Sequence, residues 1–69
     1  MFARSLANDT HHRRFTVRML PRTGWEVRDE FDTKVLKSTC YKDWHRVERA
    51  RAIFALEASQ LKDQGWTEL

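Results

Sequence analysis

The chain has 69 residues, a formal net charge of +3 and a single cysteine, Cys40. This length indicates one small domain with a thin core, because such a chain buries only about 60% of the surface that it exposes when unfolded. One cysteine excludes an internal disulfide and a cysteine-based metal cluster, so a partner subunit is the most natural source of extra stability. The mild positive charge permits nucleic acid as a partner but does not require it.

The sequence shows no apolar run of about 18 residues that could span a membrane. Its first residues also lack the apolar segment of a signal peptide. We therefore expect a soluble, cytoplasmic protein with no membrane partner, and an unpaired cysteine agrees with a reducing compartment.

Residues 1–14 have no clean hydrophobic period, and the polar run Asn8-Asp9-Thr10 would interrupt a helix. We predict that this segment is a flexible N-terminal arm, whose Phe2 and Leu6 could dock on the rest of the chain. Residues 15–69 are predicted to form a single α+β domain.

Three segments after the arm alternate apolar and polar residues, as half-buried β-strands do. They cover about residues 15–20, 25–31 and 34–40. Turn signals separate them, Pro21-Arg22-Thr23-Gly24 between the first two and Asp32-Thr33 between the last two. Short connections of this kind predict a three-stranded antiparallel meander.

The third segment has two candidate inward faces, one containing Leu36 and the other Val35. A slip of one residue would exchange them. We predict that Leu36, Ser38 and Cys40 point inward, because this placement brings Lys37 to the outer face of the sheet.

Residues 42–64 carry apolar residues at the spacing of one helical face. These residues are Val47, Ala50, Phe54, Ala58 and Leu61. Thr39 or Asp43 is the candidate N-cap, and Gly65 followed by Trp66 is typical of a Schellman C-cap that returns to Leu61. The expected fold is α+β, with the three-stranded meander covered on one face by a long C-terminal helix (β-β-β-α).

Catalytic motifs are absent: there is no glycine-rich phosphate loop, nucleophile elbow or His-Glu-x-x-His motif. Cys40 and His45 could meet, but no third group is near to orient them. Adjacent His11 and His12 cannot both face one ion from a helix or strand. We predict a non-enzymatic protein with no catalytic residues, metal site, cofactor or small-molecule substrate.

Two basic surfaces are candidate binding sites. Arg18, Arg28 and Lys37 are predicted to lie side by side across three strands, on the outer sheet face, where they could contact nucleic acid. A second basic sector lies on the helix: Lys42, Arg46 and Arg49. The alternative interpretation is an ordinary solvated surface, because acids such as Glu26 dilute the charge.

The predicted helix also carries a second apolar set away from the Val47 side: Ala52, Ile53 and Leu56. A helix that is apolar on two sides should bury the extra surface against something. We predict a protein interface here, either with a second copy in a homodimer or with the N-terminal arm.

The layout of residues 15–64, with Gly24-Trp25-Glu26-Val27 at the start of the second strand, resembles the three-stranded DNA-binding modules of tyrosine-type phage integrases and plant AP2 domains. In those families the sheet enters the major groove, so the resemblance implies nucleic-acid contact by the outer sheet face. The stretch Asp43-Trp44-His45-Arg46-Val47-Glu48 with Gly65-Trp66 is similar to small stand-alone bacterial proteins of uncharacterised function.

The leading interpretation is a small intracellular domain that works by binding and forms a homodimer. The alternative is a nucleic-acid-binding module that uses the basic outer face of the sheet.

Overall fold

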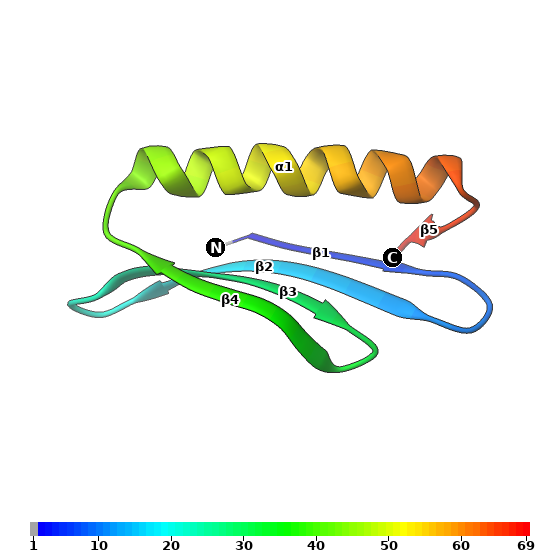
Figure 1. Ribbon diagram of the computed structural model, residues 1–69, viewed down its shortest axis with the longest axis horizontal. Coiled ribbons are helices and arrows are strands. Elements are labelled where there is room, and N and C mark those ends of the chain that lie inside the picture. Colours follow the sequence, from blue (N-terminus) through cyan, green and yellow to red (C-terminus); the bar gives the residue numbers. More distant parts are fainter. Residues whose placement is uncertain (1) are drawn as a thin grey trace.

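The computed structural model describes residues 2–69 and contains five strands and one helix. The elements are β1 (Phe2–Ala7), β2 (His12–Leu20), β3 (Gly24–Phe31), β4 (Lys34–Tyr41), α1 (Trp44–Asp63) and β5 (Thr67–Glu68). All neighbouring strands are antiparallel and the sheet order is β4-β3-β2-β1-β5, with α1 along one face (Figure 1). The predicted α+β class with one C-terminal helix is confirmed. The predicted strand number is wrong, since four long strands and a short fifth replace three.

The segment predicted to be a flexible arm forms β1 and the start of β2 instead, while Met1 lies outside the described residues. Leu6 is fully buried, and the side chain of Asn8 closes the β1–β2 turn by accepting from the backbone N–H of His11 at 2.6 Å. The sequence pattern did not predict β1, because Arg4 lies between Phe2 and Leu6 on the inward face and interrupts the apolar alternation.

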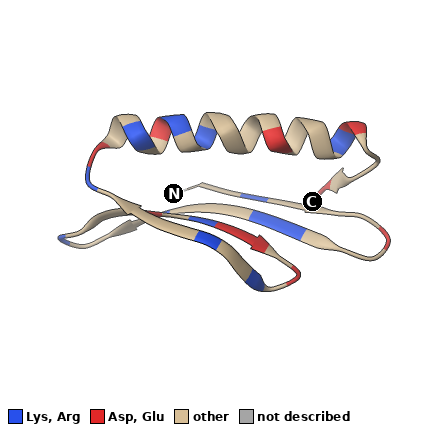
Figure 2. Ribbon diagram, in the orientation of Figure 1, with Lys and Arg blue, Asp and Glu red and all other residues tan. Residues whose placement is uncertain are grey.

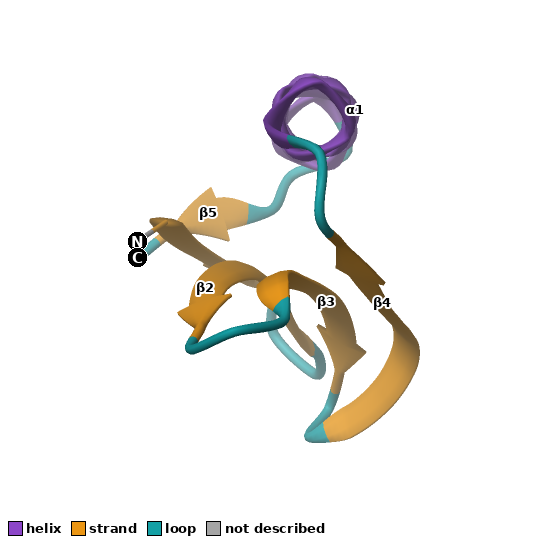
Figure 3. Ribbon diagram, turned by 90° about the vertical axis from the view of Figure 1, so that its left-hand side faces the viewer, coloured by secondary structure: helices purple, strands orange, loops and turns teal. Residues whose placement is uncertain are grey.

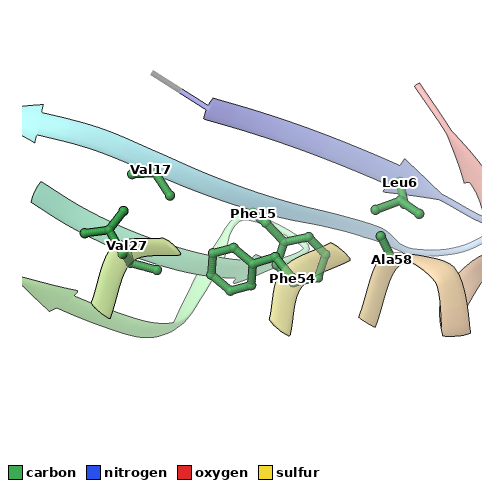
Figure 4. Packing of buried hydrophobic residues seen from close by; sticks show 7 residues of the cluster. Leu6, Phe15, Val17, Val27, Phe54 and Ala58 are labelled. Atoms are coloured by element: carbon green, nitrogen blue, oxygen red, sulfur yellow. The ribbon is translucent and has the colours of Figure 1, made fainter. Parts of the chain in front are cut away.

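The core lies between α1 and the three central strands of the sheet (Figure 4). Its members are Leu6, Phe15, Val17, Val27, Val47, Phe54 and Ala58. The rings of Phe15 on β2 and Phe54 on α1 are stacked with their centroids 4.7 Å apart. Burial of a phenylalanine side chain contributes roughly 1.5–3 kcal/mol, so this contact stabilises the packing of the helix on the sheet.

Both predicted ends of the helix are confirmed within two residues. Asp43 is the N-cap and its Oδ1 accepts from the backbone N–H of His45 at 2.9 Å. At the C-terminus Gly65 has a φ of 97° and donates to the carbonyl of Lys62, while Trp66 donates to the carbonyl of Leu61, both at 3.0 Å. These two hydrogen bonds define a Schellman motif.

The Schellman turn directs the chain back to the sheet as β5, which pairs with β1. Glu68 holds the strand in place, because it accepts two hydrogen bonds of 2.7 Å from Arg4 and lies 2.6 Å from Lys62 Nζ. The C-terminal end of α1 is thereby linked to β1 through Lys62, Glu68 and Arg4.

The predicted face of β4 is wrong. Lys37 lies opposite Asp29 and Thr39 opposite Val27, and Val27 is buried under α1, so Lys37 and Thr39 are on the helix side. The residues predicted to point inward are exposed: Leu36, Ser38 and Cys40. The physical reason is that none of the residues of β4, Lys34–Tyr41, is buried, so burial does not select a face for this edge strand.

Candidate functional site

A groove of about 380 Å³ opens between α1 and the half of the sheet that β3 and β4 form. Its apolar lining includes Val27 from the sheet and Ala50, Ile53 and Phe54 from α1. The groove exists because α1 is fastened on its other side, where Arg51 lies over the ring of Phe2 at 5.0 Å and Glu68 binds Lys62. Seen end on, the sheet curves below the helix, with β5 on one side and β4 on the other (Figure 3).

Two carboxylates line the groove, those of Asp29 and Glu57, and one arginine contacts both. Arg13 on β2 donates from Nε and Nη2 to Asp29 at 3.1 and 2.8 Å, and from Nη2 to Glu57 at 3.1 Å. The hydrogen bond to Asp29, followed by the charges of Asp29 and Glu57, raises the pKa of Arg13 above its ordinary value. Arg13 therefore remains charged and holds both acids.

Three cations on the groove lining, in contrast, are uncompensated. They are Lys37 from β4 and Arg46 and Arg49 from α1, and none of them forms an ion pair within residues 2–69. Figure 2 shows basic residues along the first half of α1, above β4. Counting Arg13, four cations face two carboxylates, so the groove carries a net charge of +2 and attracts anions.

The backbone of β4 forms one wall of the groove, and its outer side is open. Within the described chain β4 pairs with β3 alone, so every second residue of β4 has an N–H and a C=O that the sheet leaves free. A β-bulge at Asp29/Glu30 interrupts the register, and the regular part of the edge is the stretch 37–41. Lys37, Thr39 and Tyr41 of this stretch line the groove.

The three cations predicted for the outer sheet face do not gather there. Arg18 and Arg28 lie on that face, but Lys37 lies on the opposite one. Glu26 stands between the two arginines, with its Oε1 3.0 Å from Arg18 Nη2 and 4.0 Å from Arg28 Nε. The charge of the remaining pair is thus partly cancelled.

The predicted interface set on the helix is exposed, and whether a partner covers it stays a prediction. Ile53 is 49% and Leu56 61% exposed, and Ala52 is exposed as well. The N-terminal segment does not cover them, since it is β1 and pairs with β2 and β5. Ile53 lines the groove, so two predicted site residues from separate sets, Lys37 and Ile53, meet in one place.

The other residues considered for catalysis or metal binding are Cys40, His45, His11 and His12. Cys40 is exposed on β4, opposite Glu26 on the outer face, whereas His45 is in the first turn of α1. His11 Nδ1 lies 2.6 Å from Asp32, which also accepts from the backbone of His12 at 2.8 Å, so these residues join two turns. Among residues 2–69, no three His, Cys, Asp or Glu side chains gather in a metal-binding arrangement.

The sequence contained an unused signal for the Arg13 network. Asp29 falls on the apolar face of the second predicted strand, between Val27 and Phe31, and Arg13 precedes Phe15 at the same alternation. Opposite charges on the inward faces of neighbouring strands indicate a partly buried ion pair.

No protein-family model, curated protein or solved structure matches this chain. The resemblances to three-stranded DNA-binding modules and to small bacterial proteins therefore stay predictions. Within the described residues, no helix has both the length and the apolar character needed to cross a membrane.

Proposed function

We propose that this chain is a small, non-enzymatic binding domain that takes up an extended segment of another protein as an additional strand on β4. The observation that carries the proposal is the junction of a free strand edge with an apolar groove at residues 37–41. In strand addition, main-chain hydrogen bonds supply affinity, and pockets for alternate side chains supply specificity. On β4 the free strand edge, which would form the hydrogen bonds, adjoins the groove, which would hold the side chains.

A second copy of the chain is a less suitable occupant of this edge. Antiparallel pairing of two β4 strands about Thr39 would place Lys37 of each copy opposite Tyr41 of the other. Lys37 would then approach Arg46 and Arg49 of the second copy, which line the same groove as Tyr41. Like charges that face each other across a strand pair are destabilising. The homodimer predicted from Ile53 and Leu56 is kept as an alternative outcome of the test.

The nucleic-acid alternative has less support than the sequence suggested. On the outer face Arg14 lies opposite Glu30 and Arg18 opposite Glu26, so charges of opposite sign alternate across β2 and β3. Such a surface attracts phosphates weakly, because binding to a nucleic-acid backbone depends on unpaired cations.

The test selects ten-residue peptides from a displayed library against the immobilised chain and maps each selected peptide by amide hydrogen exchange. Bound peptides are expected to slow exchange at residues 37–41, because a new strand protects the free N–H groups. Selected peptides that leave the exchange of β4 unchanged would refute the proposal, as would a failure to select any peptide.

Proline substitution supplies the matched control. The N–H groups of two consecutive residues point to opposite sides of a strand, so one of Ser38→Pro and Thr39→Pro removes a free N–H and the other a sheet hydrogen bond. The variant that stays folded is expected to lose peptide binding. Sedimentation of the wild-type chain at two concentrations tests the homodimer, and a dimer that the Ile53→Glu and Leu56→Glu double variant abolishes would replace the proposal.

A further inference from the structure

Two arginines occupy the part of α1 where a helix least favours positive charge. Arg46 lies in the first turn of α1 and Arg49 in the second, and both line the groove. The helix dipole is positive at this end, and two like charges three residues apart repel each other. The nearest acids in sequence form hydrogen bonds elsewhere, since Asp43 caps the helix and Glu48 accepts from the indole N–H of Trp44 at 2.8 Å. The two charges therefore oppose the stability of the helix that carries them.

The third uncompensated cation, Lys37, is displaced from a neighbouring acid by Arg13. Lys37 lies directly opposite Asp29 in the β3–β4 ladder, where opposite charges usually attract. Arg13 nevertheless donates to both carboxylate oxygens of Asp29 and also to Glu57. Within residues 2–69, Lys37 forms no ion pair. Arg13 thus occupies the acids of the groove, and the other cations of the lining stay available to a ligand.

We infer, on the basis of the proposed function, that the segment added to β4 is acidic and that its Asp or Glu carboxylates bind Lys37, Arg46 and Arg49. Such carboxylates would offset the repulsion between the two arginines and interact favourably with the positive end of the helix dipole. Charges that oppose local helix preferences without compensation in the fold are typical of functional sites.

Peptide carboxylates suit this site better than the phosphates of a nucleic acid. The free N–H and C=O groups of β4 adjoin the same groove and pair with a peptide backbone. A nucleic acid would use the cations and leave these groups without strand partners.

The first measurement is the composition of the library peptides that the wild-type chain selects and that protect residues 37–41 from amide exchange. They are expected to contain more Asp and Glu, and less Lys and Arg, than the unselected library. Replacing all acidic residues of one such peptide by their amides, Asn and Gln, should weaken its binding roughly tenfold, because two or three partly exposed ion pairs have about this strength. Higher salt should reduce the difference, since exposed ion pairs are screened. Protecting peptides without acidic enrichment would overturn the inference.

Matched variants locate the preference on the chain. Arg49→Gln and Arg14→Gln each remove one exposed arginine charge, the first at the groove and the second on the outer face. Only Arg49→Gln is expected to reduce the difference in affinity between the acidic peptide and its amide form. Equal reduction in both variants would show that total charge decides, and would overturn the inference.

Arg46→Gln separates a binding role from a structural one. Removing a cation from the first turn of α1 should raise the melting temperature of the free chain by a few degrees or leave it unchanged. The same variant should bind the acidic peptide more weakly. Unchanged binding, or a lower melting temperature, would show that the charge serves the fold and would overturn the inference.

The outcomes separate the two proposals. If the acidic peptide and its amide form bind equally and both protect residues 37–41, the acidic ligand is wrong while strand addition stands. If no peptide protects β4, both are wrong. A ten-nucleotide single-stranded DNA that protects β4, where the peptides do not, would assign the same cations to phosphates and overturn the peptide ligand.

Discussion

Arg13 on β2 binds Asp29 on β3 through two hydrogen bonds, with Nε 3.1 Å from Oδ1 and Nη2 2.8 Å from Oδ2. The same guanidinium reaches Glu57 on α1, so one side chain connects the sheet to the helix at the groove. Both members of the pair are largely buried, with 18% and 14% of their side chains exposed. Removing one member of such a pair leaves the other charge without compensation.

Arg13→Leu is therefore expected to destabilise the domain by about 2 to 4 kcal/mol, somewhat less than for a fully buried pair. The loss follows because the carboxyl group of Asp29, 14% exposed, would lose both of its hydrogen bonds from Arg13. The free energy of unfolding, measured in urea, checks the value. The double variant Arg13→Leu with Asp29→Leu should recover part of the loss, since the charge then left without Arg13 is that of Glu57, whose side chain is 37% exposed. Additive losses in the double variant would contradict the coupling.

A second prediction concerns acid. Hydrogen bonds from Arg4, and next from Lys62, lower the pKa of Glu68 from 4.5 to about 2. A carboxyl whose pKa is depressed by folding stabilises the native state above the unfolded pKa, and this contribution disappears as the pH falls through the folded pKa. The melting temperature of the wild-type chain should thus fall between pH 4.5 and 2 as β5 loses its contacts to β1.

Glu68→Gln is the comparison for that prediction. The variant should have a flatter melting curve against pH in this range and a lower melting temperature at neutral pH. A smaller acid slope should remain, because a hydrogen bond with His11 lowers the pKa of Asp32 as well. Identical slopes in the two proteins would show that Glu68 is not the group responsible.

The elements with local signals were predictable from the sequence. The helix was predicted within two residues at each end, because Asp43 and Gly65 are specific caps and Val47, Phe54 and Ala58 recur at helical spacing. The turns before β3 and β4 were equally clear. Sequence reasoning failed at β1, where Arg4 occupies an inward position that burial alone would give to an apolar residue, and Glu68, 64 residues away, explains it.

The groove was not predictable, since it depends on where α1 lies across the sheet. Its position is decided by contacts distant in sequence, such as Phe15 with Phe54 and Arg51 with Phe2. A helix centred over all the strands would have buried one face of β4 and fixed the direction of Lys37. The residues themselves were recognised: Lys37, Arg46, Arg49 and Ile53 were all predicted to be surface binding residues, but on three different surfaces.

A third prediction compares two neighbours on α1. Phe54→Ala should cost about 3 to 5 kcal/mol, because the ring is 7% exposed and stacks on Phe15. Ile53→Ala should cost only about 1 kcal/mol, since half of the side chain is already in water. Ile53→Ala should nevertheless weaken peptide binding, while the fold remains intact by circular dichroism. A stable, cooperative Phe54→Ala protein would contradict the packing of α1 on the sheet.

The last prediction separates two glycines with similar backbone angles, Gly24 with a φ of 107° and Gly65 with a φ of 97°. A Cβ at Gly65 would meet no atom within 4 Å among residues 2–69, so Gly65→Ala should cost about 1 kcal/mol, from the backbone angle alone. A Cβ at Gly24 would collide with the backbone carbonyl of Tyr41. Gly24→Ala should therefore cost about 3 kcal/mol, the sum of backbone and packing strain.

The two variants also differ in what they do to the groove. Relieving the collision at Gly24 requires the end of β4 to move away from β3, and Tyr41 at that end lines the groove. Gly24→Ala should therefore weaken binding of a peptide that protects residues 37–41 and speed amide exchange near Tyr41, because the β3–β4 pairing opens there. Gly65→Ala changes the opposite end of α1 and should leave both quantities unchanged. Equal stability and equal affinity in the two variants would mean that the β3–β4 junction is not the rigid wall on which the added strand depends.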